Sequence, residues 1–157
     1  MEIKPQIGTA VFIFHDKKIL LSKRISTHEN AKFGVPGGKL DFGEDVEACI
    51  RREVREETKL ELKDVVALPM VSNNIYKKEG LHFICFWFVA QVDHDDKWDG
   101  KVDYVEMDKN GKPKCHGWHW YSHREVQKLP LMRGTLDALE FAKQMTDTGL
   151  VFQTTIE

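Results

Sequence analysis

Residues 37–60 read GGKLDFGEDVEACIRREVREETKL. The paired glycines predict a turn, because glycine accepts positive φ and lets other groups approach the backbone closely. A helix is expected to begin at Glu44 or Asp45, with acidic residues in its first turn as the helix dipole favours, and to run to about Thr58. The stretch therefore brings a glycine turn and a short strand before a strongly charged helix.

This helix carries carboxylates on its core-facing side. At about 100° per residue, Val46, Cys49 and Ile50 share one arc, which is typical of a stripe that packs on a core. Glu53 and Glu57 fall on the same arc, where further apolar residues would be expected. Buried carboxylates without a partner are costly, so they bind a proton or a cation. We predict a divalent metal there; a solvated helix with Glu–Arg pairs is the alternative for an ordinary helix.

Composition and charge narrow the class of protein. The 157 residues, 41% hydrophobic and 31% charged, predict one soluble globular domain over residues 1–157. A formal net charge of −2 gives no reason to expect a membrane or a stable nucleic-acid partner. The N-terminus lacks the order of a signal peptide, and the longest apolar run, near Phe83–Ala90, is too short for a bilayer. Three cysteines without a CxxC pair fit a cytoplasmic setting.

Strand and helix patterns alternate irregularly along the chain. Helices are expected from Ser122 or His123 through Gln127 and over Gly134–Thr146, and Asn73–Gly80 is expected to be a polar connection. Strands are predicted at Ile7–His15, Ile19–Arg24, Lys39–Phe42, Leu62–Ser72, Leu81–Val92 and Gly117–Tyr121. Because there is no regular βαβ alternation, the fold class is α/β or α+β, with a mixed β-sheet packed between helices.

Residues 38–60 follow the spacing G-x5-E-x7-R-E-U-x-E-E-x-G-U, where U is aliphatic, and so resemble the Nudix box. The matching residues are Gly38, Glu44, Arg52, Glu53, Val54, Glu56, Glu57 and Leu60. Lys59 stands where the family usually has glycine. This departure follows the carboxylates, at the helix end, so it concerns the shape of that turn more than the metal site. The resemblance implies a Nudix-type fold.

The resemblance also implies a metal site. Its expected ligands are Glu53 and Glu57, with Glu56 assisting, and the backbone carbonyl of Gly37. The i, i+3, i+4 spacing lets the three glutamates reach one region of space. Hard oxygen ligands suit Mg²⁺, with Mn²⁺ as the alternative. Arg52 lies beside Glu56 on the helical wheel and would orient that carboxylate.

The implied reaction is hydrolysis of a phosphoanhydride in a nucleoside diphosphate linked to another group. A bound metal lowers the pKa of a water, which attacks phosphorus in line while a glutamate takes the proton. Glu53 or Glu56 is the expected base, and a loop acid, Glu106 or Asp103, is a further candidate. Glu44 either ties the loop to the helix, acts near the metal, or is a favourable charge at the helix start.

The flanking sequence over roughly Ile7–Phe141 resembles the MutT-homologue branch, including 8-oxo-dGTP diphosphatases, which convert nucleoside triphosphates to monophosphate and pyrophosphate. By this resemblance Arg24 would meet phosphates, and Gly37, Gly38 and Lys39 would border the substrate. ADP-ribose and nucleotide-sugar pyrophosphatases are the alternative, although they commonly carry extra N-terminal sequence. A non-catalytic nucleotide- or RNA-binding module is the alternative of another class; such modules often lose box carboxylates.

Three aromatic side chains are candidates for stacking on a base, namely Phe33, Trp118 and Trp120. Burial in the core is the commoner role for such side chains. The sequence leaves open which base is preferred, whether oxidised nucleotides are favoured, and whether the protein forms a homodimer.

Overall fold

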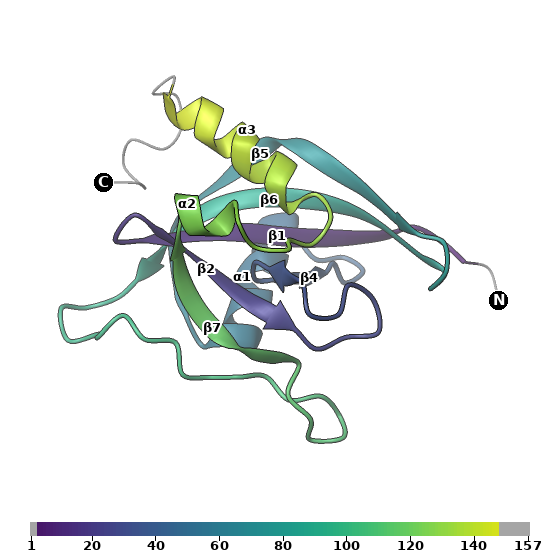
Figure 1. Ribbon diagram of the computed structural model, residues 1–157, viewed down its shortest axis with the longest axis horizontal. Coiled ribbons are helices and arrows are strands. Elements are labelled where there is room, and N and C mark those ends of the chain that lie inside the picture. Colours follow the sequence, from purple (N-terminus) through teal and green to yellow (C-terminus); the bar gives the residue numbers. More distant parts are fainter. Residues whose placement is uncertain (1–2, 148–157) are drawn as a thin grey trace.

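The computed structural model describes residues 3–147 and shows a mixed β-sheet with helices on both faces (Figure 1). The elements are β1 (Gln6–His15), β2 (Lys18–Arg24), β3 (Phe33–Gly34), β4 (Gly37–Lys39), α1 (Val46–Thr58), β5 (Glu61–Tyr76), β6 (Leu81–Asp93), β7 (Cys115–Ser122), α2 (His123–Val126) and α3 (Thr135–Asp147). The described strands form one seven-stranded sheet in the order β3-β2-β1-β6-β5, with β4 paired to β1 and β7 to β2. The predicted fold class is confirmed, whereas a single domain over residues 1–157 reaches beyond the described residues and stays a prediction.

β1 divides its side chains between two cores, because successive residues of a strand face opposite sides of the sheet. Val11 and Ile13 pack with Ile50 of α1. Phe12 packs on the other face with Leu139 of α3. All five side chains are almost fully buried. The sheet is therefore covered on both faces, and α1 is held against it by its apolar half.

β6 lies inside the sheet, parallel to β1 and antiparallel to β5, as expected for its nearly continuous apolar sequence. β5 is longer than predicted: the expected connection from Asn73 is wrong, because β5 continues to Tyr76. Asn74 and Tyr76 are buried and pair with Phe83 and Leu81 of β6. Polar residues therefore continue the strand where it borders a pocket.

The strand before α1 lies two residues earlier than predicted. β4 comprises Gly37–Lys39 and pairs antiparallel with β1, so the predicted strand Lys39–Phe42 is wrong. The start of α1 agrees with the sequence, because the Asp45 carboxylate caps the helix by accepting hydrogen bonds from the N–H groups of Glu47 and Ala48, at 3.0 and 3.2 Å. The helix is thus fixed at the edge of β4.

The two C-terminal helices are those predicted. α2 begins with a capping box, in which Ser122 and Glu125 exchange side chain–backbone hydrogen bonds. α3 covers the sheet face opposite α1 (Figure 1). Within residues 3–147, no helix has the length and apolar character required to cross a membrane.

Candidate active site

β4 brings backbone, not side chains, against the acidic end of α1. Gly38 pairs with Thr9 of β1, and a Cβ added at Gly38 would fall on the Glu53 carboxylate. A Cβ at Gly37 would instead run into the β1 backbone at Thr9 and Ala10. Neither glycine has a positive φ. Both are required because neighbouring groups approach them closely, which is one of the two reasons the sequence suggested.

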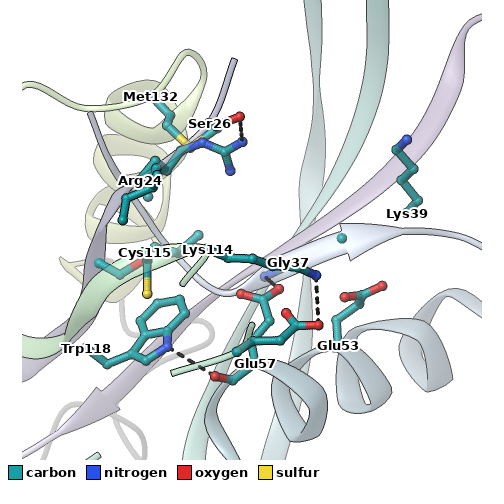
Figure 2. A pocket seen from close by; sticks show the side chains of 16 residues that line it. Arg24, Ser26, Gly37, Lys39, Glu53, Glu57, Lys114, Cys115, Trp118 and Met132 are labelled. Carbon is teal, nitrogen blue, oxygen red and sulfur yellow. Dashed lines mark hydrogen bonds and ion pairs between the residues drawn. The ribbon is translucent and has the colours of Figure 1, made fainter. Parts of the chain in front are cut away.

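Glu53 and Glu57 reach into a cavity of about 450 Å³, here called the acidic pocket (Figure 2). The Glu53 side chain is 15% exposed, and Glu57 Oε1 accepts a 3.2 Å hydrogen bond from the Gly37 N–H. Burial raises the pKa of the Glu53 carboxyl, and it raises the pKa of Glu57 well above its usual range although the Gly37 N–H opposes this shift. A bound cation would offset the cost of ionising both groups. Other walls of the pocket include Arg24, Gly38, Lys39, Glu106, Lys114 and Trp118.

Arg52 is the centre of an ionic network beside this pocket. Its Nε and Nη2 donate to the two Glu44 carboxylate oxygens at 2.7 and 3.0 Å. Its Nη1 donates to Glu53 at 2.9 Å and to Glu56 at 3.2 Å. The bidentate contact holds the pKa of Glu44 at about 2, and in return raises that of Arg52. Arg52 therefore contacts Glu56, and Glu44 links the loop to the helix through Arg52 and the Asp41 N–H. The functional roles of Arg52 and Glu44 stay predictions.

Glu56 lies at the rim of the network and does not line the acidic pocket. Its side chain is 49% exposed, whereas that of Glu53 is 15% exposed. Within residues 3–147, no three acidic, histidine or cysteine side chains already surround one point as a complete cation site. Glu53 and Glu57 supply hard oxygen donors, so a divalent cation would also need oxygens from water or phosphate. The ligand roles of Glu56 and of the Gly37 carbonyl stay predictions.

A loop acid does reach the acidic pocket. Of the two candidates, Glu106 lines the pocket and Asp103 is exposed to solvent. Glu106 belongs to the long connection between β6 and β7 and forms an ion pair of 2.8 Å with Lys114 Nζ. The backbone N–H of Lys114 also donates to the Glu106 carbonyl at 2.9 Å. Glu106 is therefore fixed by both the main chain and the side chain of Lys114.

A second cavity, of about 220 Å³, adjoins the first and has more apolar walls. We call it the aromatic pocket, after Tyr76, Phe83 and Trp87 in its lining. The residues common to both pockets are Arg24, Val35, Gly37, Gly38, Lys39 and Met132. β4 and the end of β2 are therefore the shared wall between an acidic and an aromatic cavity.

Arg24 lies on the side of the acidic pocket opposite the two carboxylates (Figure 2). Its Nη2 donates to Ser26 Oγ at 3.1 Å, but its buried Nε finds no partner among the described residues. A buried donor without an acceptor is costly, and an anion would satisfy it. The ammonium of Lys39 lies 5.8 Å from the centre of the Phe83 ring. The predicted phosphate contact of Arg24 thus fits its position, with Lys39 at the aromatic side.

The three aromatic candidates for base stacking do not line the aromatic pocket. Trp118 is 6% exposed and donates from Nε1 to the Glu57 carbonyl at 3.2 Å, which holds the end of α1. Phe33 is partly buried and packs against the core on the α3 face. Trp120 belongs to a separate group of rings with His15. All three side chains pack in or against the core, and Trp118 also lines the acidic pocket.

Sequence reasoning missed a cluster of Glu29, Tyr76 and Arg133, of which Tyr76 and Arg133 line the aromatic pocket. The Glu29 side chain is 4% exposed and accepts hydrogen bonds from the Tyr76 hydroxyl at 2.7 Å and from the Arg133 N–H at 3.0 Å. The Arg133 guanidinium lies 5.2 Å from the centre of the Tyr76 ring. These contacts join residues 47 and 104 positions apart, so no local spacing signals them.

Comparison with known proteins decides the family. A model described as the NUDIX domain matches residues 4–142. The chain belongs to the Nudix family of hydrolases. The family and the class of enzyme predicted from the sequence are thereby confirmed. Nudix hydrolases generally use divalent metal ions, and the acidic pocket holds two carboxylates of the Nudix box, those of Glu53 and Glu57.

The chain is also similar to individual known proteins. An uncharacterized Nudix hydrolase of Bacillus subtilis, YvcI, is 30% identical over 158 residues, covering 95% of this chain and 84% of the relative. An ADP-ribose pyrophosphatase of Methanocaldococcus jannaschii is 34% identical over 90 residues, covering 57% of this chain and 53% of the relative, so the match spans about half the length of that protein. A MutT NUDIX hydrolase structure from Burkholderia pseudomallei has a TM-score of 0.72 and 30% identity, covering 87% of this chain and 97% of that one.

Proposed function

We propose that this Nudix chain hydrolyses a phosphoanhydride bond of a nucleoside diphosphate linked to another group. The observation that carries the proposal is the shared wall of the two pockets. One pocket presents buried carboxylates, which suit a cation-bound phosphate chain. The other presents aromatic side chains, which suit a nucleoside. A ligand with both parts would lie across Gly37–Lys39, and Arg24 would contact the phosphates between them.

The glutamates at the end of α1 would have separate roles in this reaction. Glu53 and Glu57 would hold Mg²⁺, or alternatively Mn²⁺, with Glu56 and the Gly37 carbonyl in support. The bound cation would neutralise phosphate charge and lower the pKa of the attacking water. Burial raises the pKa of Glu53 toward the range that suits a general base, so Glu53 or Glu56 remains the candidate for that role.

The substrate we favour is a ribo- or deoxyribonucleoside triphosphate, cleaved to monophosphate and pyrophosphate, with oxidised nucleotides as a natural extension. The similarity to a MutT hydrolase structure over 87% of the chain supports this choice. The 34% identity to an ADP-ribose pyrophosphatase favours ADP-ribose or a nucleotide sugar as the second candidate. A non-catalytic binding module is less well supported, because Glu53, Glu57 and Glu106 together line one pocket.

A substrate panel tests the proposal. The protein is incubated with Mg²⁺ and normal or oxidised nucleoside triphosphates, ADP-ribose, nucleotide sugars and capped RNA, and products are identified by mass. Pyrophosphate release supports the triphosphate reading, and AMP with ribose phosphate supports the second candidate. Glu53→Gln and Glu57→Gln should each lower kcat by at least about tenfold. Absence of any product across the panel would favour the binding module.

The cellular compartment and the binding partners of the protein are part of the proposal. Cys49, Cys85 and Cys115 are free thiols, which agrees with the reducing, cytoplasmic compartment we propose. The partner is a small nucleotide, with no membrane and no stable nucleic-acid partner. A homodimer stays an alternative that a sedimentation experiment would decide.

A further inference from the structure

Lys114 places an ammonium group among the carboxylates of the acidic pocket. Its Nζ lies 2.8 Å from Glu106 Oε1, and the pocket also contains Glu53 and Glu57. The backbone of Lys114 is fixed, because its N–H donates to the Glu106 carbonyl at 2.9 Å. Its side chain is nevertheless 52% exposed. The ammonium can therefore change partners while the backbone hydrogen bond between Lys114 and Glu106 is kept.

The position of Lys114 also brings it near the phosphate side of the pocket. The Lys114 carbonyl accepts a hydrogen bond from the Ile25 N–H at 3.0 Å, directly after Arg24 at the end of β2. Arg24 itself is paired with Cys115, the residue after Lys114, in the β2–β7 register. Figure 2 shows Lys114 between Arg24 and the carboxylates of Glu53 and Glu57. A phosphate bound at Arg24 would therefore border the same flexible ammonium that pairs with Glu106.

The two cationic side chains beside the acids differ in freedom. The Arg52 guanidinium is held in place by hydrogen bonds to Glu44, Glu53, Glu56 and the Lys39 carbonyl. Lys114 has a direct ion pair with Glu106, while the charges of Glu57 and Glu53 add to the raised pKa of its ammonium. A divalent cation bound by these carboxylates would repel this ammonium, and a phosphate would attract it.

We propose that Lys114 exchanges partners when the cation and the substrate bind. Its ammonium offsets the negative charge of the acidic pocket while no divalent cation is present. It moves to the substrate phosphate once the cation occupies the carboxylates. Lys114 is then a competitor of the metal in the free protein and a ligand of the phosphate in the complex. The exchange makes cation binding and phosphate binding favour each other, because the metal frees the ammonium that the phosphate uses. This inference rests on the proposed function.

The test compares Lys114→Met with Lys112→Met and with wild type. Lys112 is an exposed lysine of the same connection, outside both pockets, so its replacement removes the same net charge. Mn²⁺ affinity of the protein alone is measured by electron paramagnetic resonance, and KM and kcat are measured with the best substrate of the panel. Lys114→Arg keeps the charge and should stay close to wild type in metal affinity.

Lys114→Met is expected to strengthen Mn²⁺ binding and to weaken substrate binding. Lys114→Met should bind Mn²⁺ about three- to tenfold more tightly, because a competing charge is gone. Its KM should rise about tenfold, the effect of one charge-assisted hydrogen bond, while kcat changes less. Lys112→Met should leave both quantities within about twofold. Thermal melting of the variants shows whether the fold is kept.

Other outcomes separate this inference from the function it rests on. Weaker binding of both Mn²⁺ and substrate in Lys114→Met, with a lower melting temperature, would mean that Lys114 only holds the Glu106 loop. Equal Mn²⁺ affinity in Lys114→Met and wild type would overturn the exchange while leaving the Nudix reaction standing. Failure of the wild type to bind Mn²⁺ or cleave any substrate would instead overturn the proposed function.

Discussion

The ammonium of Lys59 lies 4.4 Å from the centre of the Tyr104 ring. Lys59 caps α1 in a left-handed conformation, with φ 63°, at the position where the Nudix box usually has glycine. Tyr104 belongs to the connection that carries Glu106. The side chain that replaces the glycine thus links the end of α1 to the loop that reaches the acidic pocket.

Lys59→Gly should leave global stability nearly unchanged but loosen this loop. Relief of left-handed strain contributes roughly 1 kcal/mol, and loss of the cation–π contact costs a similar amount. Amide hydrogen exchange should therefore rise around Tyr104 and Glu106 while the melting temperature moves by only a few degrees. Lys59→Arg keeps a cation and is the control. Unchanged exchange in Lys59→Gly would show that the contact does not hold the loop.

The two glycines of β4 should respond differently to alanine. Gly38→Ala directs its Cβ at the movable Glu53 carboxylate, so the fold should survive while Mn²⁺ affinity falls at least about tenfold. Gly37→Ala directs its Cβ at the β1 backbone and should cost about 2 kcal/mol or more of unfolding free energy. Urea unfolding and Mn²⁺ titration of both variants make the comparison. Equal loss of stability would contradict it.

Stabilisation by Mg²⁺ should grow with pH. Burial raises the pKa values of Glu53 and Glu57 in the metal-free fold above the unfolded value of 4.5, so the folded protein binds more protons than the unfolded chain as pH rises past that value. The contribution of these two carboxyl groups to metal-free stability is therefore fully present below pH 4.5 and is lost as pH rises through the raised pKa values. Mg²⁺ replaces those protons, so its effect on melting temperature should be larger at about pH 8 than at about pH 5.5.

A control variant identifies the groups responsible for this pH dependence. Glu57→Gln cannot ionise at that position, so its metal-free melting temperature should fall less between the two pH values, and Mg²⁺ should stabilise it weakly at both. A Mg²⁺ effect that is the same at both pH values in the wild type would exclude Glu53 and Glu57 as its source.

Tyr76→Phe tests the hydrogen bond between Tyr76, which lines the aromatic pocket, and Glu29. The variant removes the hydroxyl that donates to the nearly buried Glu29 carboxylate. It should lower the unfolding free energy by about 1 to 3 kcal/mol, because that carboxylate loses a donor. KM for the nucleotide should also rise, since Glu29 anchors Arg133 beside the pocket. Glu29→Gln with Tyr76→Phe should cost less than the sum of the single changes, which a double-mutant cycle measures.

The local sequence pattern was sufficient to predict α1 and the face on which its acidic side chains lie. The 3.6-residue period placed Glu53 and Glu57 on the face that meets the sheet, and capping by Asp45 follows from residue type. The strand before the helix was misplaced because Gly37 and Gly38 have no side chains to show strand periodicity; their backbone pairing with β1 makes them a strand. Such pairing depends on a distant segment and leaves no trace in the local sequence.

The aromatic pocket and the Lys114 contact depend on the whole fold. Tyr76 meets Glu29 only after β5 pairs with β6, and the polar residues near Asn74 look like a loop unless that pairing is known. The local sequence does not single out Lys114, since its neighbours in the pocket come from α1 and from the loop at Glu106. Charge spacing along a sequence shows partners on one helix and misses partners brought together by strands.

The shared wall of β4 has a consequence for turnover. The strand is three residues long, roughly 7 Å between its first and last Cα. An intact ligand that spans it is held at two points joined by a short tether, so each attachment raises the effective concentration of the other. Scission of the phosphoanhydride separates the two attachments. Each fragment then dissociates on its own weaker contacts, so bond cleavage itself would promote release and limit inhibition by product.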